Sequence, residues 1–390
     1  MDFKNKNILL ILHAGVLGGA ERQGLGLGRI LVEKYSCNVY LLLTHSEKMS
    51  DEFKEFAEKC HIQDIFHFGE PYIVLRQEFS FKNLKRLVWS SKYLLRMRKG
   101  LLPYKIDLIF PFLNFPSKIA FYLYKLLPTA KFTFWHQLGL DVFKDDVFEK
   151  LAAKYTPGVI ANAPNGIELF REAHKLEDKR AFVLPQFLTM KYKYFSREET
   201  RQKYHITQDS VVIGMVSHYR PDKKHELLLQ AFLELTENFP NINLIFLGYK
   251  DANPVTLEKY ERILKRINSQ KLQSKVLVLS GKPVEEILSI MDIGVLVSEI
   301  EGTPNVVMEY MLYELPIIAS RHPGCVALLD NSPFLIENNI IELKKGLATL
   351  IASKNLRKKE GMKNKEIINR YTPENYMNEF NKIMNALIDG

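Results

Sequence analysis

Short apolar runs alternate along the whole chain with longer stretches in which apolar residues recur at helical spacing. Runs of four to eight apolar, β-branched residues are typical of buried parallel strands, and the stretches between them are typical of helices that cover a sheet. The expected strands are residues 7–12, 38–44, 106–112, 131–135, 159–161, 210–217, 243–248, 275–279, 293–297 and 315–319. Strands alternating with helices in this way predict an α/β fold with parallel sheets.

The length of the chain favours two domains. A chain of 390 residues is long for one hydrophobic core. The βα pattern also falls into two series of similar size, with a break near residues 183–195, and a last helix is expected over residues 372–388.

Composition places the chain among soluble globular proteins. Its hydrophobic content is 46% and its charged content 25%, and no apolar run approaches the ~18 residues of a membrane span. Residues 8–12 are too short for the apolar core of a signal peptide, and Cys37, Cys60 and Cys325 lack metal spacing. These features predict a cytoplasmic protein with reduced thiols. The net charge of +9 suggests anionic partners, which include nucleic acid, phosphorylated ligands and an acidic membrane surface.

The stretch from residue 293 to residue 320 carries the strongest chemical pattern. Between its two strands the sequence predicts a helix that Thr303 caps, with Pro304 at the first helical position. The free amides at such a helix start favour an anion such as a phosphate. Glu301 precedes the cap, and Glu309 falls in the second turn of the helix.

Glu309 is difficult to explain by packing, because its helix is otherwise almost wholly apolar. A buried carboxylate needs hydrogen-bond donors or a cation. Sugar hydroxyls are suitable donors, and a neighbouring Lys or Arg is the structural alternative.

The sequence SEIEGTPNVVMEYMLYELPIIAS resembles the nucleotide-sugar site of the retaining glycosyltransferases of family four, which have the GT-B fold. The resemblance implies that Glu301 faces the hydroxyls of the donor sugar and that Glu309 holds the ribose. It also implies that backbone amides at the helix start approach the sugar and the phosphates; these belong to Thr303, Pro304, Asn305 and Val306. Glu314 stands where the family has a glycine.

The first strand is followed by a glycine loop, HAGVLGGAER. A dinucleotide fingerprint fits poorly, because no acidic residue ends the second strand and Gly24, Gly26 and Gly28 lie inside the helix. Close packing of that helix is the simple interpretation of these three glycines. The loop instead resembles the family's N-terminal glycine loop, which implies that Gly18 and Gly19 let the backbone approach the donor phosphate.

The loop after residue 217 reads HYRPDKKHE and places cations where a diphosphate could bind. The family has an arginine and a lysine five residues apart here, and Lys223 matches the lysine. His218 stands at the arginine position, so either Arg220 or His218 takes that role, and we favour Arg220. An exposed basic turn is the alternative interpretation.

Two further groups lie at the carboxyl ends of expected strands, where ligands of α/β sheets gather. His136 resembles the histidine that lies beside the donor sugar in the family, although a lone histidine is more often structural. Gly281, Lys282 and Pro283 follow another strand, at the position where the family contacts the nucleotide base.

Residues 76–105 combine many lysines and arginines with Leu84, Trp89, Leu95 and other apolar residues. This pattern predicts a basic amphipathic helix from about residue 70 to residue 104. Its cations either face water while the helix packs on its sheet, or they dock on an anionic membrane surface.

The resemblance implies two Rossmann-like domains facing a cleft. They would comprise residues 1–190 on the acceptor side and residues 191–371 for the nucleotide sugar, with the helix of residues 372–390 crossing back to the first domain. The implied enzyme is a retaining hexosyltransferase with Glu301, His136, Lys223 and Arg220 as catalytic residues. It would need no metal and no cofactor besides the donor.

The implied donor is a UDP-sugar in preference to a GDP-sugar, and the acceptor is a hydroxyl of a glycan or a lipid-linked glycan. Bacterial surface polysaccharide or lipopolysaccharide synthesis on the inner face of the cytoplasmic membrane is the expected setting, without a nucleic-acid partner. The alternatives are another GT-B enzyme, such as a nucleotide-sugar epimerase or a phosphorylase, and a non-catalytic anion-binding protein.

Overall fold

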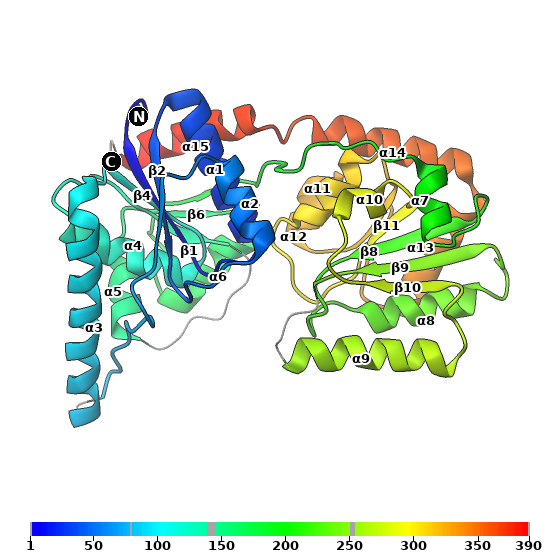
Figure 1. Ribbon diagram of the computed structural model, residues 1–390, viewed down its shortest axis with the longest axis horizontal. Helices are drawn as coiled ribbons and strands as arrows, with labels where there is room; N and C mark the ends of the chain where they lie inside the picture. The colour runs from blue at the N-terminus through cyan, green and yellow to red at the C-terminus, as the bar shows by residue number, and fades with distance from the viewer. Residues whose placement is uncertain (1, 79, 139–145, 250–253, 389–390) are drawn as a thin grey trace. The chain divides into compact units, whose positions relative to one another are not determined.

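The computed structural model describes residues 2–78, 80–138, 146–249 and 254–388. The chain forms two compact units, of which unit 1 comprises residues 1–189 and 373–390 and unit 2 comprises residues 190–372. Both are α/β units with parallel strands, so the expected fold class is confirmed (Figure 1).

The elements of unit 1 follow in chain order and end with the last helix of the chain. They are β1 (Asn7–Leu12), α1 (Gly19–Tyr35), β2 (Asn38–Leu43), α2 (Asp51–Lys59), β3 (Asp64–Phe66), α3 (Phe81–Leu101), the 3₁₀ turn η1 (Leu102–Tyr104), β4 (Leu108–Pro111), α4 (Asn114–Leu126), β5 (Trp135–Gln137), α5 (Val147–Tyr155), β6 (Val159–Ala161), α6 (Pro164–His174), β7 (Ala181–Val183) and α15 (Pro373–Ile388).

A four-stranded parallel sheet of order β3-β2-β1-β4 forms the centre of unit 1, and β5, β6 and β7 form a second parallel sheet. Because side chains alternate along a strand, Ile8, Leu10 and Leu12 of β1 join one core with α1, α2 and α15. Leu9 and Ile11 join the core beneath α3 and α4 on the opposite face. Both faces of β1 are therefore buried, as its continuous apolar run predicts.

The glycines inside α1 have a packing role. A Cβ at Gly24 would lie 2.6 Å from Leu12, and one at Gly28 would lie 2.9 Å from Leu10. These two glycines let α1 approach β1 closely, while a Cβ at Gly26 would meet Thr189 at 3.0 Å. Close packing therefore explains all three residues.

Two expectations for unit 1 need correction. The strand expected at residues 131–135 is β5, which begins only at Trp135, while Phe132 forms an isolated bridge with Leu108. The basic helix expected from about residue 70 is α3, which begins only at Phe81. Ser80 is its N-cap, and the Ser80 hydroxyl accepts a hydrogen bond from the Asn83 amide at 3.2 Å. Residue 79 lies outside the described part of the chain.

Unit 2 repeats the βα pattern. Its elements are α7 (Arg197–Lys203), β8 (Val211–Val216), α8 (His225–Leu235), β9 (Ile242–Leu247), α9 (Pro254–Ser269), β10 (Val276–Leu279), α10 (Val284–Leu288), β11 (Ile293–Leu296), α11 (Asn305–Leu312), β12 (Ile317–Ser320), α12 (Pro323–Leu329), β13 (Leu335–Ile336), α13 (Ile340–Ala352) and α14 (Lys354–Ile368).

The sheet of unit 2 has the order β10-β9-β8-β11-β12-β13. From β8 the chain adds β9 and β10 on one side and later adds β11, β12 and β13 on the other, so the direction of winding changes between β8 and β11. Such a switch point leaves a crevice outside the carboxyl ends of the two strands, where ligands of open α/β sheets bind.

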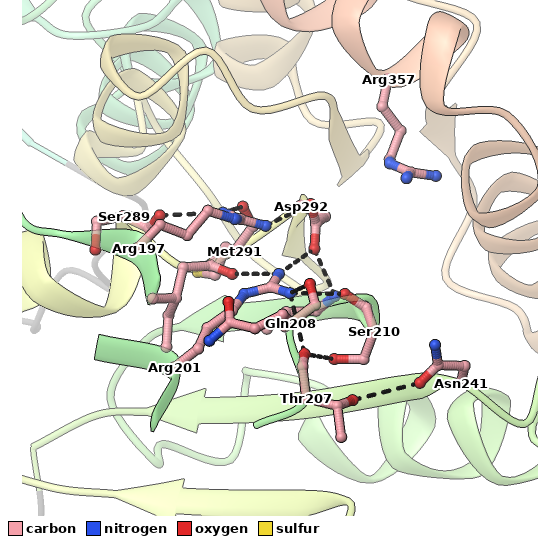
Figure 2. Close-up of polar contacts among 12 residues, drawn as sticks. Arg197, Arg201, Thr207, Gln208, Ser210, Asn241, Ser289, Met291, Asp292 and Arg357 are labelled. Carbon is pink, nitrogen blue, oxygen red and sulfur yellow. Dashed lines mark hydrogen bonds and ion pairs between the residues drawn. The ribbon is translucent and has the colours of Figure 1, made fainter. Parts of the chain in front are cut away.

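A buried charge network fixes the opposite, amino ends of β8 and β11. Asp292 accepts hydrogen bonds from Arg201 at 2.7 Å, from Arg197 at 2.6 Å and from the Val212 amide at 2.8 Å (Figure 2). Arg201, whose side chain is 1% exposed, also donates to several backbone carbonyls around it. The network ties α7 to both strands and so sets the register of the pair that carries the switch point.

Candidate functional site

The loops that follow β8 and β11 are joined to each other by their backbones. Lys223 forms an isolated antiparallel bridge with Ser298. The Lys224 amide donates to the Val297 carbonyl at 2.8 Å, and the Glu299 amide donates to the Asp222 carbonyl at 2.8 Å. Residues that are far apart in the sequence are therefore held side by side at the switch point.

The pairing brings Lys223 and Glu301 into contact. The Lys223 ammonium forms an ion pair with the Glu301 carboxylate, and each side chain is only 12% exposed. Lys223 also lies 3.6 Å from the Asp222 carboxylate. Two residues that the sequence predicts for one site, from different loops, thus meet in the structure.

Arg220 is close to this pair in sequence but points to a different partner. Its guanidinium donates to both carboxylate oxygens of Asp222, at 2.8 and 3.1 Å, and its side chain is 61% exposed. Burial alone would raise the pKa of Asp222, but the hydrogen bond from Arg220 and the charges of Lys223 and Arg220 outweigh burial and lower this pKa. Arg220 is thus held at the rim of the loop.

His218, the other candidate for the arginine role, is half-buried, with its ring 6.2 Å from that of Tyr249. A second histidine, His225, packs against the start of this loop. It is fully buried, its Nε2 lies 3.1 Å from the Ser217 hydroxyl, and burial lowers its pKa to about 3. His225 is therefore neutral at pH 7 and serves as packing beneath the cations.

The helix after β11 begins one residue later than the sequence predicts. Pro304 is the N-cap, with an extended backbone at ψ 119°, and Asn305 is the first residue of α11. The expectation that Thr303 is the cap and Pro304 the first helical residue is therefore wrong. The loop before α11 packs closely on α12, because a Cβ at Gly324 would lie 1.8 Å from the Gly302 carbonyl oxygen, and local capping rules do not include this contact.

Glu309 is buried within α11. It is 4% exposed, and its neighbours Met308 and Tyr310 are at most 1% exposed. The Tyr310 hydroxyl accepts a hydrogen bond from the Val216 amide at 2.8 Å and donates one to the Val295 carbonyl at 3.2 Å. Tyr310 thereby fixes α11 to the ends of β8 and β11, and with it the position of Glu309.

The end of α11 adopts the geometry that a glycine would favour. Glu314 has a φ of 56°, in the left-handed region that L residues rarely occupy. The chain therefore leaves this helix in the conformation that the family glycine would give, although a glutamate fills the position.

Gly281, Lys282 and Pro283 lie further along the same edge of the sheet. Gly281 has a φ of 65°, which only glycine adopts without strain, and Pro283 is the N-cap of α10. These residues follow β10, which β9 separates from β8. They share the carboxyl edge with Lys223 but lie two strands away from its loop.

Gly18, Gly19 and His136 belong to unit 1. Gly18 is the N-cap of α1 and Gly19 is its first residue. Sequence reasoning missed Glu21, which is 7% exposed, with its carboxylate 2.7 Å from the place of a Cβ on Gly18. A glutamate at the third helical position is the capping-box pattern, which could have identified it.

The pKa of Glu21 is raised to about 7 by burial, against hydrogen bonds from the backbone of Glu21, Gly18 and Ala14 that lower it. Part of the hydrogen-bonding capacity at the start of α1 is thus used by the chain itself. Fewer backbone N–H groups of the glycine loop are therefore left to bind an anion.

His136 is buried beside the end of β4. Its Nδ1 lies 3.1 Å from the Pro111 carbonyl, so this nitrogen carries the proton and Nε2 remains an acceptor. Burial lowers its pKa to about 4, although the bond to Pro111 opposes the shift, and the ring packs edge-on against Phe112 at 4.9 Å. At pH 7 His136 is therefore a neutral imidazole that can accept a hydrogen bond from a hydroxyl.

Comparison with known proteins gives a consistent result. Residues 196–366 match the family model "Glycosyl transferases group 1". An uncharacterized glycosyltransferase of Methanocaldococcus jannaschii is 24% identical over 262 residues, which are 62% of this chain and 63% of that protein. The match thus spans less than two thirds of the relative.

Solved structures resemble the chain over nearly its whole length. Anabaena HepE, in a complex with UDP and glucose, is 17% identical and has a TM-score of 0.77, covering 98% of this chain and 100% of that one. WaaG, a glycosyltransferase involved in lipopolysaccharide biosynthesis, is 16% identical with a TM-score of 0.63, covering 95% and 96%. The fold is that of the GT-B glycosyltransferases. Residues 196–366 of the chain are thus similar to the group 1 glycosyl transferases.

Proposed function

We propose that this protein is a retaining, metal-independent hexosyltransferase that moves a sugar from a nucleoside diphosphate sugar to a hydroxyl of a glycan or a lipid-linked acceptor. The observation that carries this proposal is the contact between Lys223 and Glu301 at the switch point of unit 2, next to the helix that holds the buried Glu309. The cation and the helix start would bind the phosphates of the donor. Glu301 would bind the sugar hydroxyls, and Glu309 would bind the ribose.

The leaving diphosphate gains negative charge as the glycosidic bond opens. Lys223, Arg220 and the amides at the start of α11 would stabilise that charge without reorganising, as in an oxyanion site. Lys223 would then be shared between the diphosphate and Glu301, so Glu301 would keep the ammonium in place while it accepts hydrogen bonds from the donor sugar. Glu309 would accept hydrogen bonds from the ribose hydroxyls.

UDP is our preferred nucleotide over GDP, because HepE, a structural relative, was obtained with UDP. A role in lipopolysaccharide or surface polysaccharide synthesis is supported by the likeness to WaaG. In the part of the chain that the structure describes, no helix is long and apolar enough to cross a membrane. We place the protein in the cytoplasm, with residues 76–105 as the segment that meets an anionic membrane surface.

A panel of nucleotide sugars tested by thermal shift identifies the donor, because a ligand that binds only the folded state raises its melting temperature. We expect one UDP-sugar to raise it most. Product analysis by NMR with that donor and acceptor glycans should then show a new glycosidic bond of unchanged anomeric configuration, without added metal. An isomerised donor, a sugar phosphate or the absence of any nucleotide-sugar binding would each overturn the proposal.

A further inference from the structure

Unit 2 has a pocket at the edge of its sheet that is opposite to the candidate donor site. Its volume is about 410 Å³, which is within the range of small-molecule sites. Ser289 and Met291 of its lining precede β11, and Leu315 precedes β12. The pocket therefore lies where these strands begin, whereas Lys223 and Glu301 belong to loops that follow strands.

Aromatic side chains line this pocket. Tyr192, Tyr194 and Phe195 come from the segment before α7, and Tyr313 follows α11. Tyr192 is 57% exposed and Tyr194 is 75% exposed. The rings of Tyr192 and Tyr313 lie 5.0 Å apart at an angle of 39°. Exposed rings at a hollow offer flat apolar surfaces to a ligand.

The segment that carries these rings is held by Tyr313. The Tyr313 hydroxyl accepts a hydrogen bond from the Lys193 amide at 3.2 Å and donates one to the Lys193 carbonyl at 3.0 Å. Lys193 is the residue between Tyr192 and Tyr194. The two hydrogen bonds therefore fix the backbone from which both exposed rings project.

Two cations line the pocket, and both have partners. The Lys365 ammonium donates to the Leu312 carbonyl at 2.7 Å and lies 3.9 Å from the Glu314 carboxylate. Arg197 forms an ion pair with Asp292 at 2.6 Å (Figure 2). Because a carboxylate lies close to each positive charge, the pocket does not need an anionic ligand to balance it.

Glu314 places a carboxylate at the pocket at a cost in backbone strain. Its φ of 56° is in the left-handed region, which a glycine adopts without strain. Helix α14 fixes this turn, because Asn364 donates to the Leu315 carbonyl at 2.8 Å and a Cβ at Gly361 would lie 1.9 Å from the Glu314 carbonyl oxygen. The Glu314 side chain is 58% exposed, and its 3.9 Å ion pair with Lys365 adds little stability. Packing therefore does not explain the glutamate.

We propose that this pocket binds a neutral sugar ring of a glycan. The face of a pyranose ring that carries C–H groups packs on Tyr192 and Tyr194. Its hydroxyls donate to the Glu314 carboxylate and accept from the remaining N–H groups of Lys365. Glu314 repels an anionic sugar. The inference goes beyond the proposed function, because the pocket would hold a glycan chain at a point away from the donor site.

Ligand-observed NMR with methyl glycosides tests the inference without a donor or a transfer reaction. The probes are the methyl pyranosides of glucose, galactose, mannose and N-acetylglucosamine, with methyl glucuronide as the anionic counterpart. We expect at least one neutral glycoside to bind with a dissociation constant on the order of 1 mM, and the glucuronide to bind more weakly. Binding of the glucuronide alone, or of no probe, would overturn the inference.

Matched tyrosine variants locate the binding. Tyr194→Ala removes one exposed ring and leaves the hydrogen bonds of Tyr313 in place, so it should weaken binding of the neutral glycoside about fivefold or more. Tyr155→Ala is the control, since Tyr155 is a 56% exposed tyrosine of unit 1. Equal affinities of the two variants would show that the sugar binds elsewhere.

Glu314→Gly separates a ligand role from a structural one. The substitution relieves the backbone strain and should raise the melting temperature, while it weakens binding of the glycoside about fivefold or more. A lower melting temperature with unchanged glycoside affinity would show that Glu314 serves the fold.

Nucleotide binding keeps this test apart from the proposed function. The affinity of UDP, measured by calorimetry, should be the same in Tyr194→Ala and in the wild type. A parallel loss of UDP affinity would show that the pocket binds the nucleotide and not a sugar. Glycoside binding by a wild type that binds no nucleotide sugar would overturn the proposed function and leave this inference standing.

Discussion

At the scale of single residues, burial sets the charge state of several titratable groups in each unit. His136 and His225 are buried, and their lowered pKa values keep both neutral at pH 7. Burial raises the pKa of Glu21, because the uncharged form of a carboxyl group is the protonated one. Arg220 and Lys223 form ion pairs with Asp222 and Glu301.

Glu21 should make stability depend on pH. Its pKa is about 7 in the folded chain and close to 4.5 when unfolded, so the folded state binds the proton more tightly. Stability should therefore fall as pH rises from about 4.5 to about 7, by about 3 kcal/mol from this group. Glu21→Gln removes the titration, and denaturant unfolding at pH 5 and pH 8 should show that the wild type loses about this much relative to the variant. An identical pH dependence in both proteins would contradict the burial of a titrating carboxyl.

Lys223 should matter more for turnover than its neighbour in sequence. We expect Lys223→Ala to reduce sugar transfer about tenfold or more, because one charge-assisted contact to the diphosphate is lost. Lys224→Ala is the matched control, since Lys224 lies in the same loop as Lys223 but pairs with Glu299 of the loop after β11. Equal turnover in the wild type and Lys223→Ala would remove Lys223 from the site.

At the scale of elements, β8, β11 and α11 form the frame of the site. Arg201 and Asp292 hold the amino ends of the two strands, and Tyr310 holds their carboxyl ends to α11. The loops that follow the two strands carry the functional groups. Their geometry is thus set from both ends of the strand pair.

The network at the amino ends should be essential for stability. Asp292→Ala leaves Arg201 buried without its counter-ion and should cost about 3–5 kcal/mol of unfolding free energy. Arg197→Ala removes a cation whose side chain is 41% exposed, so its effect should be about 1 kcal/mol or less. Similar midpoints of denaturant unfolding for the two variants would show that the network is not what fixes β8 and β11.

Much of this frame could be predicted from the sequence, and the exceptions have physical causes. The apolar runs located β1 and β6 at their observed bounds, because strands buried on both faces leave a continuous signal. The start of α11 was misplaced because local capping rules do not include the packing of Gly302 against Gly324. The contact between Lys223 and Glu301 depends on a pairing of distant loops, which only the fold determines.

At the scale of the whole molecule, each unit has a hydrophobic core of its own. Unit 1 is completed by the last helix of the chain, since Phe380 of α15 stacks on Phe3 at 6.0 Å and meets Phe110 edge-on at 5.4 Å. The proposed donor residues of α11 and of the loop after β8 lie in unit 2. The two units should therefore respond differently to mutation and to ligand.

Calorimetric unfolding should reveal this difference. Phe380→Ala should destabilise unit 1 by about 3–5 kcal/mol, as expected for truncating a buried aromatic residue. A bound nucleoside diphosphate should raise the unfolding transition of unit 2. If Phe380→Ala lowers the nucleotide-sensitive transition as much as the other one, the separation of the two cores is wrong.

The most direct test of the central claim is the affinity of the donor for Glu309→Gln, measured by titration calorimetry with the nucleoside diphosphate sugar that the panel selects. The substitution keeps the shape of a side chain that is 4% exposed, so the melting temperature should change little. We predict that donor affinity falls at least tenfold, because an amide replaces the carboxylate that accepts the ribose hydroxyls. A variant that folds normally and binds the donor as tightly as the wild type would contradict the account.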